Sequence, residues 1–208
     1  MFRDLIKDED TLDAVLGGTP SSIARAKDIL ALDDHCRRYI AASPFLVLAT
    51  SDAEGSCRAS PRGGPAGFVH VLDDHHLVIP DYTGNKRAEA HRDLLVNPRM
   101  QLLFLLPGMR ETLRISGHAV ITREPDLLAS LVTGGAKPPK LALGVTVTQA
   151  FLQCAKALHR SQLWTHEAWP ARDELPRAAE IFRDHVADGR TTEEIQAHLD
   201  ISYRDRVW

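Results

Sequence analysis

The sequence lacks several features that would place a protein in a class at once. Its three cysteines, Cys36, Cys57 and Cys154, form no CxxC pair, so we expect neither a zinc ribbon nor a disulfide framework. The purest apolar run, residues 102–107, is far shorter than the roughly 20 residues that span a bilayer. The N-terminal stretch carries acidic residues among its apolar ones, unlike a signal peptide. These absences predict a cytoplasmic protein that does not enter a membrane.

The chain also lacks an excess of positive charge. It has 25 lysine and arginine residues against 28 aspartate and glutamate residues, a net charge of −3. Because nucleic-acid-binding domains are usually basic, we expect no nucleic-acid partner, and any anion site must be local. No HExxH or GxSxG motif is present, so we predict no metal site and assign no catalytic residue.

What the sequence does contain is a strand-rich middle bracketed by helices. The periodicity predicts helices over 3–16, 20–42, 85–96 and 148–160, a short helix after Pro125, and two more helices from 171 onward. It predicts strands over 44–50, 57–62, 67–72, 76–80, 99–106, 111–121 and 141–147. Strands that follow each other through tight turns favour an antiparallel sheet closed into a barrel.

The most informative segment is DYTGNKRA, residues 81–88. Asn85 is a good helix N-cap, and Lys86 and Arg87 follow it where a helix dipole favours acidic residues. Two cations at this end would destabilise the helix, but an anion bound there would make their position favourable. The alternative is two solvated cations on a surface helix.

A second segment points to the same chemistry. Arg58, Ser60 and Arg62 alternate along a predicted strand, so all three lie on one face. Two guanidinium groups with a hydroxyl between them suit phosphate oxygens. The alternative is an exposed edge strand, where charges prevent edge-to-edge pairing. The glycines at 63, 64 and 67 allow either a close backbone approach to a ligand or a simple loop.

Other residues give weaker indications of function. Cys154 falls in a predicted helix and is interpreted as a buried structural thiol. Trp164 and Trp169 are able to cover a flat ligand, although tryptophans that pack helices together are more common. The C-terminal tail opens its second helix with a capping box, Thr191 to Glu194, and only faintly suggests a DNA-binding helix pair.

The order of these elements and the stretches PFLVLATSDAEG, ASPRGGPAGFVHVLDDHHLVIPD, GNKRAEAHRDLLVNP, LLFLLPGMRETLRISGHA and FLQCAKALHRSQLW resemble the pyridoxamine 5′-phosphate oxidase-like flavoproteins. The resemblance covers about residues 20–170 and is closest to a bacterial branch with PRG in its second strand. It implies a mainly β fold with flanking helices: an antiparallel FMN-binding split β-barrel over residues 1–170, followed by a C-terminal helical extension over 171–208.

The resemblance also implies an FMN cofactor, a homodimer with sites at the subunit interface, and a small-molecule substrate or reductant. The cofactor-binding residues that it implies by position are Arg58, Ser60, Arg62, Pro80, Asp81, Asn85, Lys86, Arg87, Thr112 and Trp164. Of these, Thr112 is expected to reach the flavin ring from the partner subunit, and Trp164 to cover the cofactor.

The chain departs from the oxidases in its substrate-binding residues. They carry a Tyr-x-x-x-Arg-x-x-x-Ser run where residues 122–140 read TREPDLLASLVTGGAKPPK, and an Arg-Leu-His segment near the C-terminus where this chain ends ISYRDRVW. Oxidation of pyridoxamine phosphate is therefore not expected. The prediction is an FMN-dependent oxidoreductase of unknown substrate; the alternative is a non-enzymatic protein of the same fold that binds FMN, haem or the deazaflavin F420.

Overall fold

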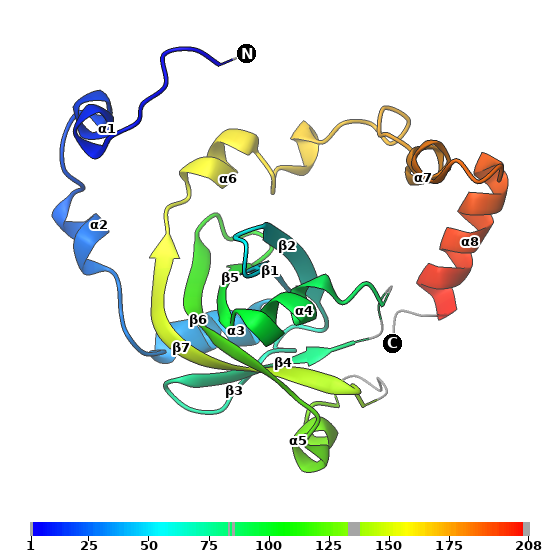
Figure 1. Ribbon diagram of the computed structural model, residues 1–208, viewed down its shortest axis with the longest axis horizontal. Coiled ribbons are helices and arrows are strands. Elements are labelled where there is room, and N and C mark those ends of the chain that lie inside the picture. Colours follow the sequence, from blue (N-terminus) through cyan, green and yellow to red (C-terminus); the bar gives the residue numbers. More distant parts are fainter. Residues whose placement is uncertain (1, 83, 85, 133–137, 206–208) are drawn as a thin grey trace.

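The computed structural model describes residues 2–82, 84, 86–132 and 138–205. Its centre is a seven-stranded antiparallel sheet in the order β2-β1-β5-β6-β7-β4-β3 (Figure 1). The strands are β1 (Phe45–Ser51), β2 (Cys57–Gly63), β3 (His70–Val71), β4 (His76–Asp81), β5 (Arg99–Leu105), β6 (Thr112–Thr122) and β7 (Leu141–Gln153). Within the described residues the edge strands β2 and β3 do not pair, so the barrel stays open. The predicted mainly β, antiparallel class with flanking helices is confirmed.

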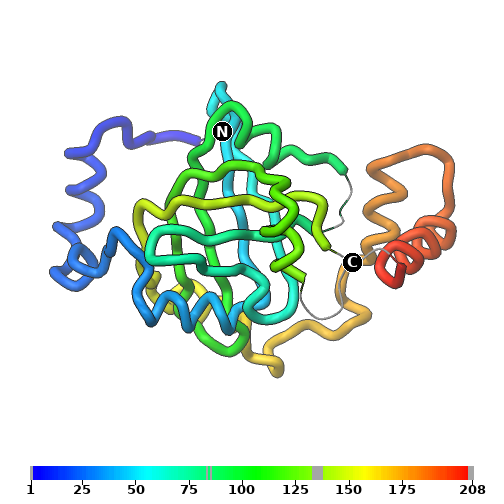
Figure 2. Tube along the Cα trace, turned by 90° about the horizontal axis from the view of Figure 1, so that it is seen from below, coloured from blue at the N-terminus to red at the C-terminus, as the bar shows by residue number. Residues whose placement is uncertain are grey.

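Some helices lie next to this sheet, and those near the two ends of the chain lie away from it (Figures 1 and 2). They are α1 (Glu9–Leu16), α2 (Ser22–Ala26), α3 (Asp34–Ala42), α4 (Glu89–Val96), α5 (Pro125–Ser130), α6 (Lys156–Ser161), the 3-10 helix η1 (His166–Ala168), α7 (Ala178–Val186) and α8 (Thr192–Asp205). Among the described helices, none is long and apolar enough to cross a membrane.

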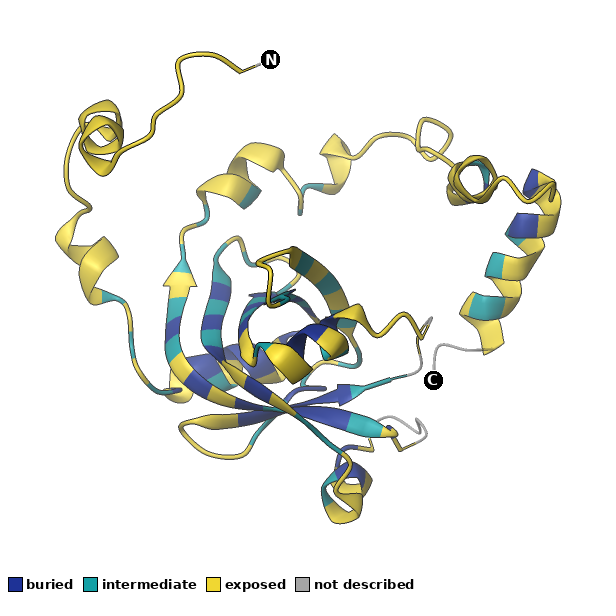
Figure 3. Ribbon diagram, viewed as in Figure 1, coloured by how far each residue is buried: buried dark blue, intermediate teal, exposed yellow. Residues whose placement is uncertain are grey.

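The core lies between the inner face of the sheet and the helices α3 and α4 (Figure 3). Leu48 of β1 and Phe104 of β5 are fully buried there. Strand β6 alternates as predicted: Leu113 and Ile115 are buried, and Arg114 between them is half-buried on the other face. Because burying a large apolar side chain contributes roughly 1.5–3 kcal/mol, this alternation fixes which face of each strand points inward.

The single helix predicted over 20–42 is wrong. The structure has two helices there, α2 and α3, separated by a non-helical segment in which Ile29 pairs with Ala150 of β7. Two backbone bonds of 2.9 and 2.8 Å join these residues, and the Leu32 amide donates to Asp74 O at 2.7 Å. Pairing with a distant strand therefore outweighs the local helical pattern.

The helix predicted over 148–160 is also wrong in its first half. Strand β7 continues to Gln153, its residues 149–153 are paired with β6, and α6 begins only at Lys156. The apolar residues among 149–152 suit a helix as well as a strand, and only pairing with the neighbouring strand β6 decides between the two.

The two ends of the chain stand away from the sheet (Figure 1). No residue of α1 or α2 is buried. At the other end, α7 and α8 pack mainly on each other. The predicted capping box is confirmed, since the Thr191 amide donates to Glu194 Oε2 at 2.8 Å and the Glu194 amide donates to Thr191 Oγ1 at 3.2 Å.

Strand β7 contains a bulge opposite Gly117 of β6. The register changes from Ser116 opposite Gln149 to Gly117 opposite Val147, so Thr148 has no partner on β6. A β-carbon on Gly117 would lie 2.3 Å from the carbonyl oxygen of Thr146. Glycine therefore permits the close approach of the two strands where β7 bends.

The three cysteines are all unpaired, and their reactivities are expected to differ. Cys154 is exposed rather than buried as predicted, because it follows the end of β7 instead of lying in a packed helix. Burial, together with a hydrogen bond to Asp33, raises the pKa of the Cys36 thiol to about 11. In the native protein at neutral pH we expect Ellman's reagent to modify Cys57 and Cys154 rapidly and Cys36 only on unfolding. Rapid modification of three thiols before denaturant is added would contradict this assignment.

Candidate functional site

The three polar residues of β2 lie on the inner face of the sheet. Arg62 stands opposite Leu46, Ser60 opposite Leu48 and Arg58 opposite Thr50. Residues directly opposite each other in an antiparallel pair share a face, and both leucines are fully buried. The prediction that Arg58, Ser60 and Arg62 share one face is confirmed, and that face points into the barrel rather than to solvent.

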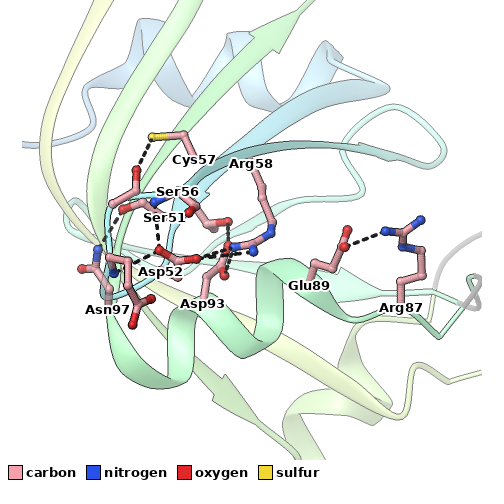
Figure 4. Close-up of polar contacts among 12 residues, drawn as sticks. Ser51, Asp52, Ser56, Cys57, Arg58, Arg87, Glu89, Asp93 and Asn97 are labelled. Carbon is pink, nitrogen blue, oxygen red and sulfur yellow. Dashed lines mark hydrogen bonds and ion pairs between the residues drawn. The ribbon is translucent and has the colours of Figure 1, made fainter.

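Arg58 lies in a network that joins β2 to α4 (Figure 4). It forms an ion pair with Asp93 of α4 and a second one, at 3.4 Å, with Asp52. Asp93 is buried, and its Oδ2 accepts a hydrogen bond of 2.6 Å from the Thr50 hydroxyl. The hydrogen bond from Arg58 to Asp93 raises the pKa of the guanidinium. Two carboxylates thus balance the charge of Arg58 and fix α4 against the sheet.

Arg62, at the other end of the row, has no such balance. Its Nε lies 3.9 Å from Asp81 Oδ1 and, among the described residues, has no hydrogen-bond partner although it is buried. Burial lowers the pKa of Arg62, and the Asp81 charge only partly offsets this. Buried donors almost always have a partner, so this nitrogen points to a missing acceptor.

His91 of α4 reaches the same carboxylate. Its Nε2 lies 3.2 Å from Asp81 Oδ1, and this atom too is buried without a hydrogen-bond partner among the described residues. Asp81 is the last residue of β4, so β2, β4 and α4 each bring one titratable side chain to the cluster.

The segment before α4 differs from its prediction. The helix begins at Glu89, not at 85, and its N-cap is Ala88, which makes no side-chain capping bond. Asn85, predicted as the cap, lies outside the described residues. Lys86 and Ala88 both have left-handed backbones, with φ of 62° and 53°. Such conformations cost a non-glycine residue roughly 1–2 kcal/mol each, and strain of this kind is concentrated at ligand sites.

Lys86 and Arg87 consequently precede the helix instead of occupying its first turn. Both are exposed, and Arg87 donates to Glu89 at 2.7 Å. Glu89 is the acidic residue that the helix dipole favours in the first turn. Both cations thus lie in the segment directly before α4.

The glycines beside β2 are explained by packing. A β-carbon on Gly64 would lie 2.8 Å from Phe68 Cβ. Gly67, with φ of 77°, would place one 3.0 Å from the Ala41 carbonyl oxygen. Of the two roles that the sequence allowed for these glycines, a tightly packed loop accounts for Gly64 and Gly67.

The remaining predicted residues divide between two places. Pro80 is buried in β4 next to Asp81. Thr112 lies at the start of β6 on the face opposite to Leu113, with its hydroxyl 3.5 Å from Gln153 Oε1. Trp164 is half-buried over the β5–β6 turn, and its Nε1 donates to Met109 O at 2.8 Å. Among the described residues, no hydrogen bond or ion pair joins Thr112 or Trp164 to the cluster around Asp81.

Sequence reasoning missed two residues of this region, Asp93 and His91. Asp93 follows Ala90 by three positions and precedes Leu94, so it lies on the buried side of α4, where both of those residues are buried. A charged residue on the apolar side of a helix was the available signal for Asp93. Nothing in the sequence pairs His91 with Asp81. In the part of the chain that the structure describes, no three His, Cys, Asp or Glu residues gather in a way that suits a metal ion.

Asp93 is expected to be important for stability. Asp93→Ala leaves the Thr50 hydroxyl and Arg58 without their buried acceptor and should cost about 2 kcal/mol of unfolding free energy. For a chain of this size that lowers Tm by about 4–8 °C, measurable by thermal denaturation. The matched control is Asp74→Ala, which removes an exposed partner of Arg37 and should change stability by less than about 1 kcal/mol. Equal Tm shifts for both variants would contradict the role of the network.

Residues 32–154 match the family model described as Pyridoxamine 5'-phosphate oxidase. A pyridoxine/pyridoxamine 5'-phosphate oxidase of Anaeromyxobacter dehalogenans (strain 2CP-C) is 32% identical over 111 residues, which are 51% of this chain and 48% of that protein. The chain thus spans about half the length of this relative.

Two solved structures follow a similar chain path. HupZ of Group A Streptococcus is 17% identical, with a TM-score of 0.48 and coverage of 58% of this chain and 93% of that one. An FMN-binding protein of Syntrophomonas wolfei is 11% identical, with a TM-score of 0.42 and coverage of 56% and 86%.

Proposed function

Because the chain belongs to the pyridoxamine 5'-phosphate oxidase family, we propose that it is an FMN-dependent oxidoreductase that holds the FMN phosphate between β2 and the segment before α4. The proposal goes beyond family membership in naming the cofactor, the activity and the residues. Its substrate is a small molecule other than pyridoxamine phosphate, since the substrate-binding run of the oxidases is missing from residues 122–140.

The observation that carries this proposal is the Nε of Arg62, which is buried beside Asp81 and, among the described residues, makes no hydrogen bond. Arg62 is half-buried, while Lys86 and Arg87 are exposed in the segment that precedes α4. A phosphate monoester offers several acceptor oxygens and about two negative charges, so it matches both the missing acceptor and the excess of cations. The residues present therefore fit the phosphate end of FMN.

In this proposal each residue has a distinct role. Arg62 binds the phosphate from inside the barrel, and Lys86 and Arg87 bind it from the solvent side. Asn85 and Ser60 donate further hydrogen bonds, and Arg58 supports the row through its fixed position beside Asp93. Pro80 and Asp81 lie along the flavin. Bound FMN supplies hydride transfer, and the protein contributes binding, orientation and electrostatics.

The proposal extends to the assembly. Thr112 and Trp164 lie by the β5–β6 turn rather than in the Asp81 cluster, as expected if they contact the flavin bound to a second copy of the chain. We propose a cytoplasmic homodimer in which residues 1–170 form the FMN-binding domain and 171–208 the helical extension. The mutual packing of α7 and α8, apart from the sheet, supports this division.

The test is a visible absorption spectrum of the purified protein with and without added FMN, recorded after gel filtration. Flavin bands that co-elute with the protein and extract as FMN are expected. NAD(P)H is then added without oxygen, and bleaching of the bands shows reduction and supports the enzyme. Bound FMN that NAD(P)H or dithionite leaves unchanged would contradict an oxidoreductase, and a haem or F420 spectrum would contradict the cofactor.

A further inference from the structure

The His91 side chain is the feature of this site that neither the sequence nor the proposed function uses. It is only 14% exposed, lies on α4, and points its Nε2 at the carboxylate that also faces Arg62. His91 Nε2 and Arg62 Nε are both buried and, within the described residues, neither atom makes a hydrogen bond. Two buried nitrogen atoms from different elements face the same carboxylate oxygen without a hydrogen bond to it, so both can donate to a further acceptor at this point.

We propose that His91 is a further anion-binding residue, which binds the ligand's phosphate in its imidazolium form beside Arg62. This inference rests on the proposed function for the identity of the ligand as a phosphate monoester, but not for the location of the anion.

Charge explains why the imidazolium form is required. With His91 neutral, Arg62 and Asp81 cancel, and a phosphate would meet no net attraction from the inner wall of the pocket. With His91 protonated, the three side chains carry one net positive charge and both ring nitrogens donate. Protonation of His91 thus offsets the Asp81 carboxylate, which otherwise repels the phosphate.

The other charged groups around α4 either have a partner within the protein or are exposed to solvent. On β2, Arg58 pairs with Asp52 and Asp93. On β6, Arg114 donates to Gln101, and His118 is exposed. On the turn before the helix, Arg87 pairs with Glu89, and Lys86 is exposed. Lys86 and Arg87 add to the attraction for an anion but face it from the solvent side.

The first experiment follows the histidine ring resonances by NMR while inorganic phosphate is added to the full-length protein near neutral pH. His91 is assigned by the disappearance of its signals in His91→Gln. We expect the His91 resonances to move toward imidazolium values as phosphate saturates, while exposed His198 on α8 stays unchanged. Resonances of His91 that do not respond to phosphate would overturn the inference.

The second experiment measures FMN and riboflavin affinities of the same proteins by flavin fluorescence. His91→Gln is expected to lose about tenfold in FMN affinity, the loss of one charge-assisted contact, and to bind riboflavin as the wild type does. His198→Gln is the matched control and should change neither. Equal losses for FMN and riboflavin in His91→Gln would overturn the inference in favour of a purely structural histidine.

The two experiments separate this inference from the proposed function. If the wild type binds no FMN but phosphate still shifts the His91 resonances, the anion site stands and the flavin assignment fails. If FMN binds and His91→Gln leaves its affinity unchanged, the flavin assignment stands and the role of His91 is wrong.

Discussion

Replacing Lys86 and Arg87 together by alanine is expected to weaken FMN binding by about a hundredfold or more. Each cation supplies a charge-assisted contact to the phosphate worth roughly 1.5–3 kcal/mol, and every 1.4 kcal/mol corresponds to about a factor of ten. Alanine keeps the β-carbon, so the left-handed backbone at Lys86 is no harder to form in the variant. The change therefore tests charge rather than the shape of the turn.

The matched control for this variant is Arg92→Ala, which removes an exposed cation from α4 itself. It should bind FMN nearly as the wild type does. Riboflavin, which has no phosphate, should bind the double variant and the wild type equally. Isothermal titration or fluorescence quenching measures each of these affinities. Wild-type FMN affinity in the double variant would show that the phosphate lies elsewhere, whatever the flavin content of the protein.

Gly117→Ala is expected to cost about 3 kcal/mol of stability, the upper part of the range for overpacking. The added β-carbon would lie 2.3 Å from the Thr146 carbonyl oxygen and 3.2 Å from Val145 Cγ1. A backbone carbonyl in the middle of a sheet has no rotamer through which to move away, so the strands must separate. For a chain of this length, Tm should fall by about 6–12 °C in thermal denaturation.

Gly144→Ala is the control on the neighbouring strand. Its β-carbon would meet only the Val120 side chain, at 3.4 Å, and we expect a change below about 1 kcal/mol. Similar Tm values for the two variants would mean that the sheet yields at the bulge. The bulge divides β7 into two parts. The first part pairs with β4, the strand whose last residue is Asp81, and the second part pairs with Ile29. Loss of the bend should therefore also disturb the cluster around Asp81.

The sequence predicts the strands better than the helices because strand alternation is a local pattern with a direct cause. Arg58, Ser60 and Arg62 were placed on one face correctly, since a period of two leaves no other arrangement. Which side that face points to depends on Leu46 and Leu48 across the ladder, so only the folded sheet shows that the arginines face inward.

The errors have a common physical origin in contacts between distant segments. Residues 27–33 are not helical because Ile29 pairs with Ala150, and residues 149–153 are extended because β6 lies beside them. The late start of α4 follows from two left-handed residues, for which the sequence offers no glycine as a signal. The Asp81–His91 contact joins a strand end to a helix and has no sequence spacing by which it can be found.

The inward position of the β2 arginines also determines why this barrel has a gap. To close, β2 would have to pair with β3, the other edge of the sheet. That would enclose Arg62 still further from water, and Pro61 of β2 has no amide proton to give to a new ladder. The side chains of β2, rather than the number of strands, thus account for the gap between β2 and β3. In the proposed function these arginines bind the phosphate, and the same side chains leave the pocket open to it.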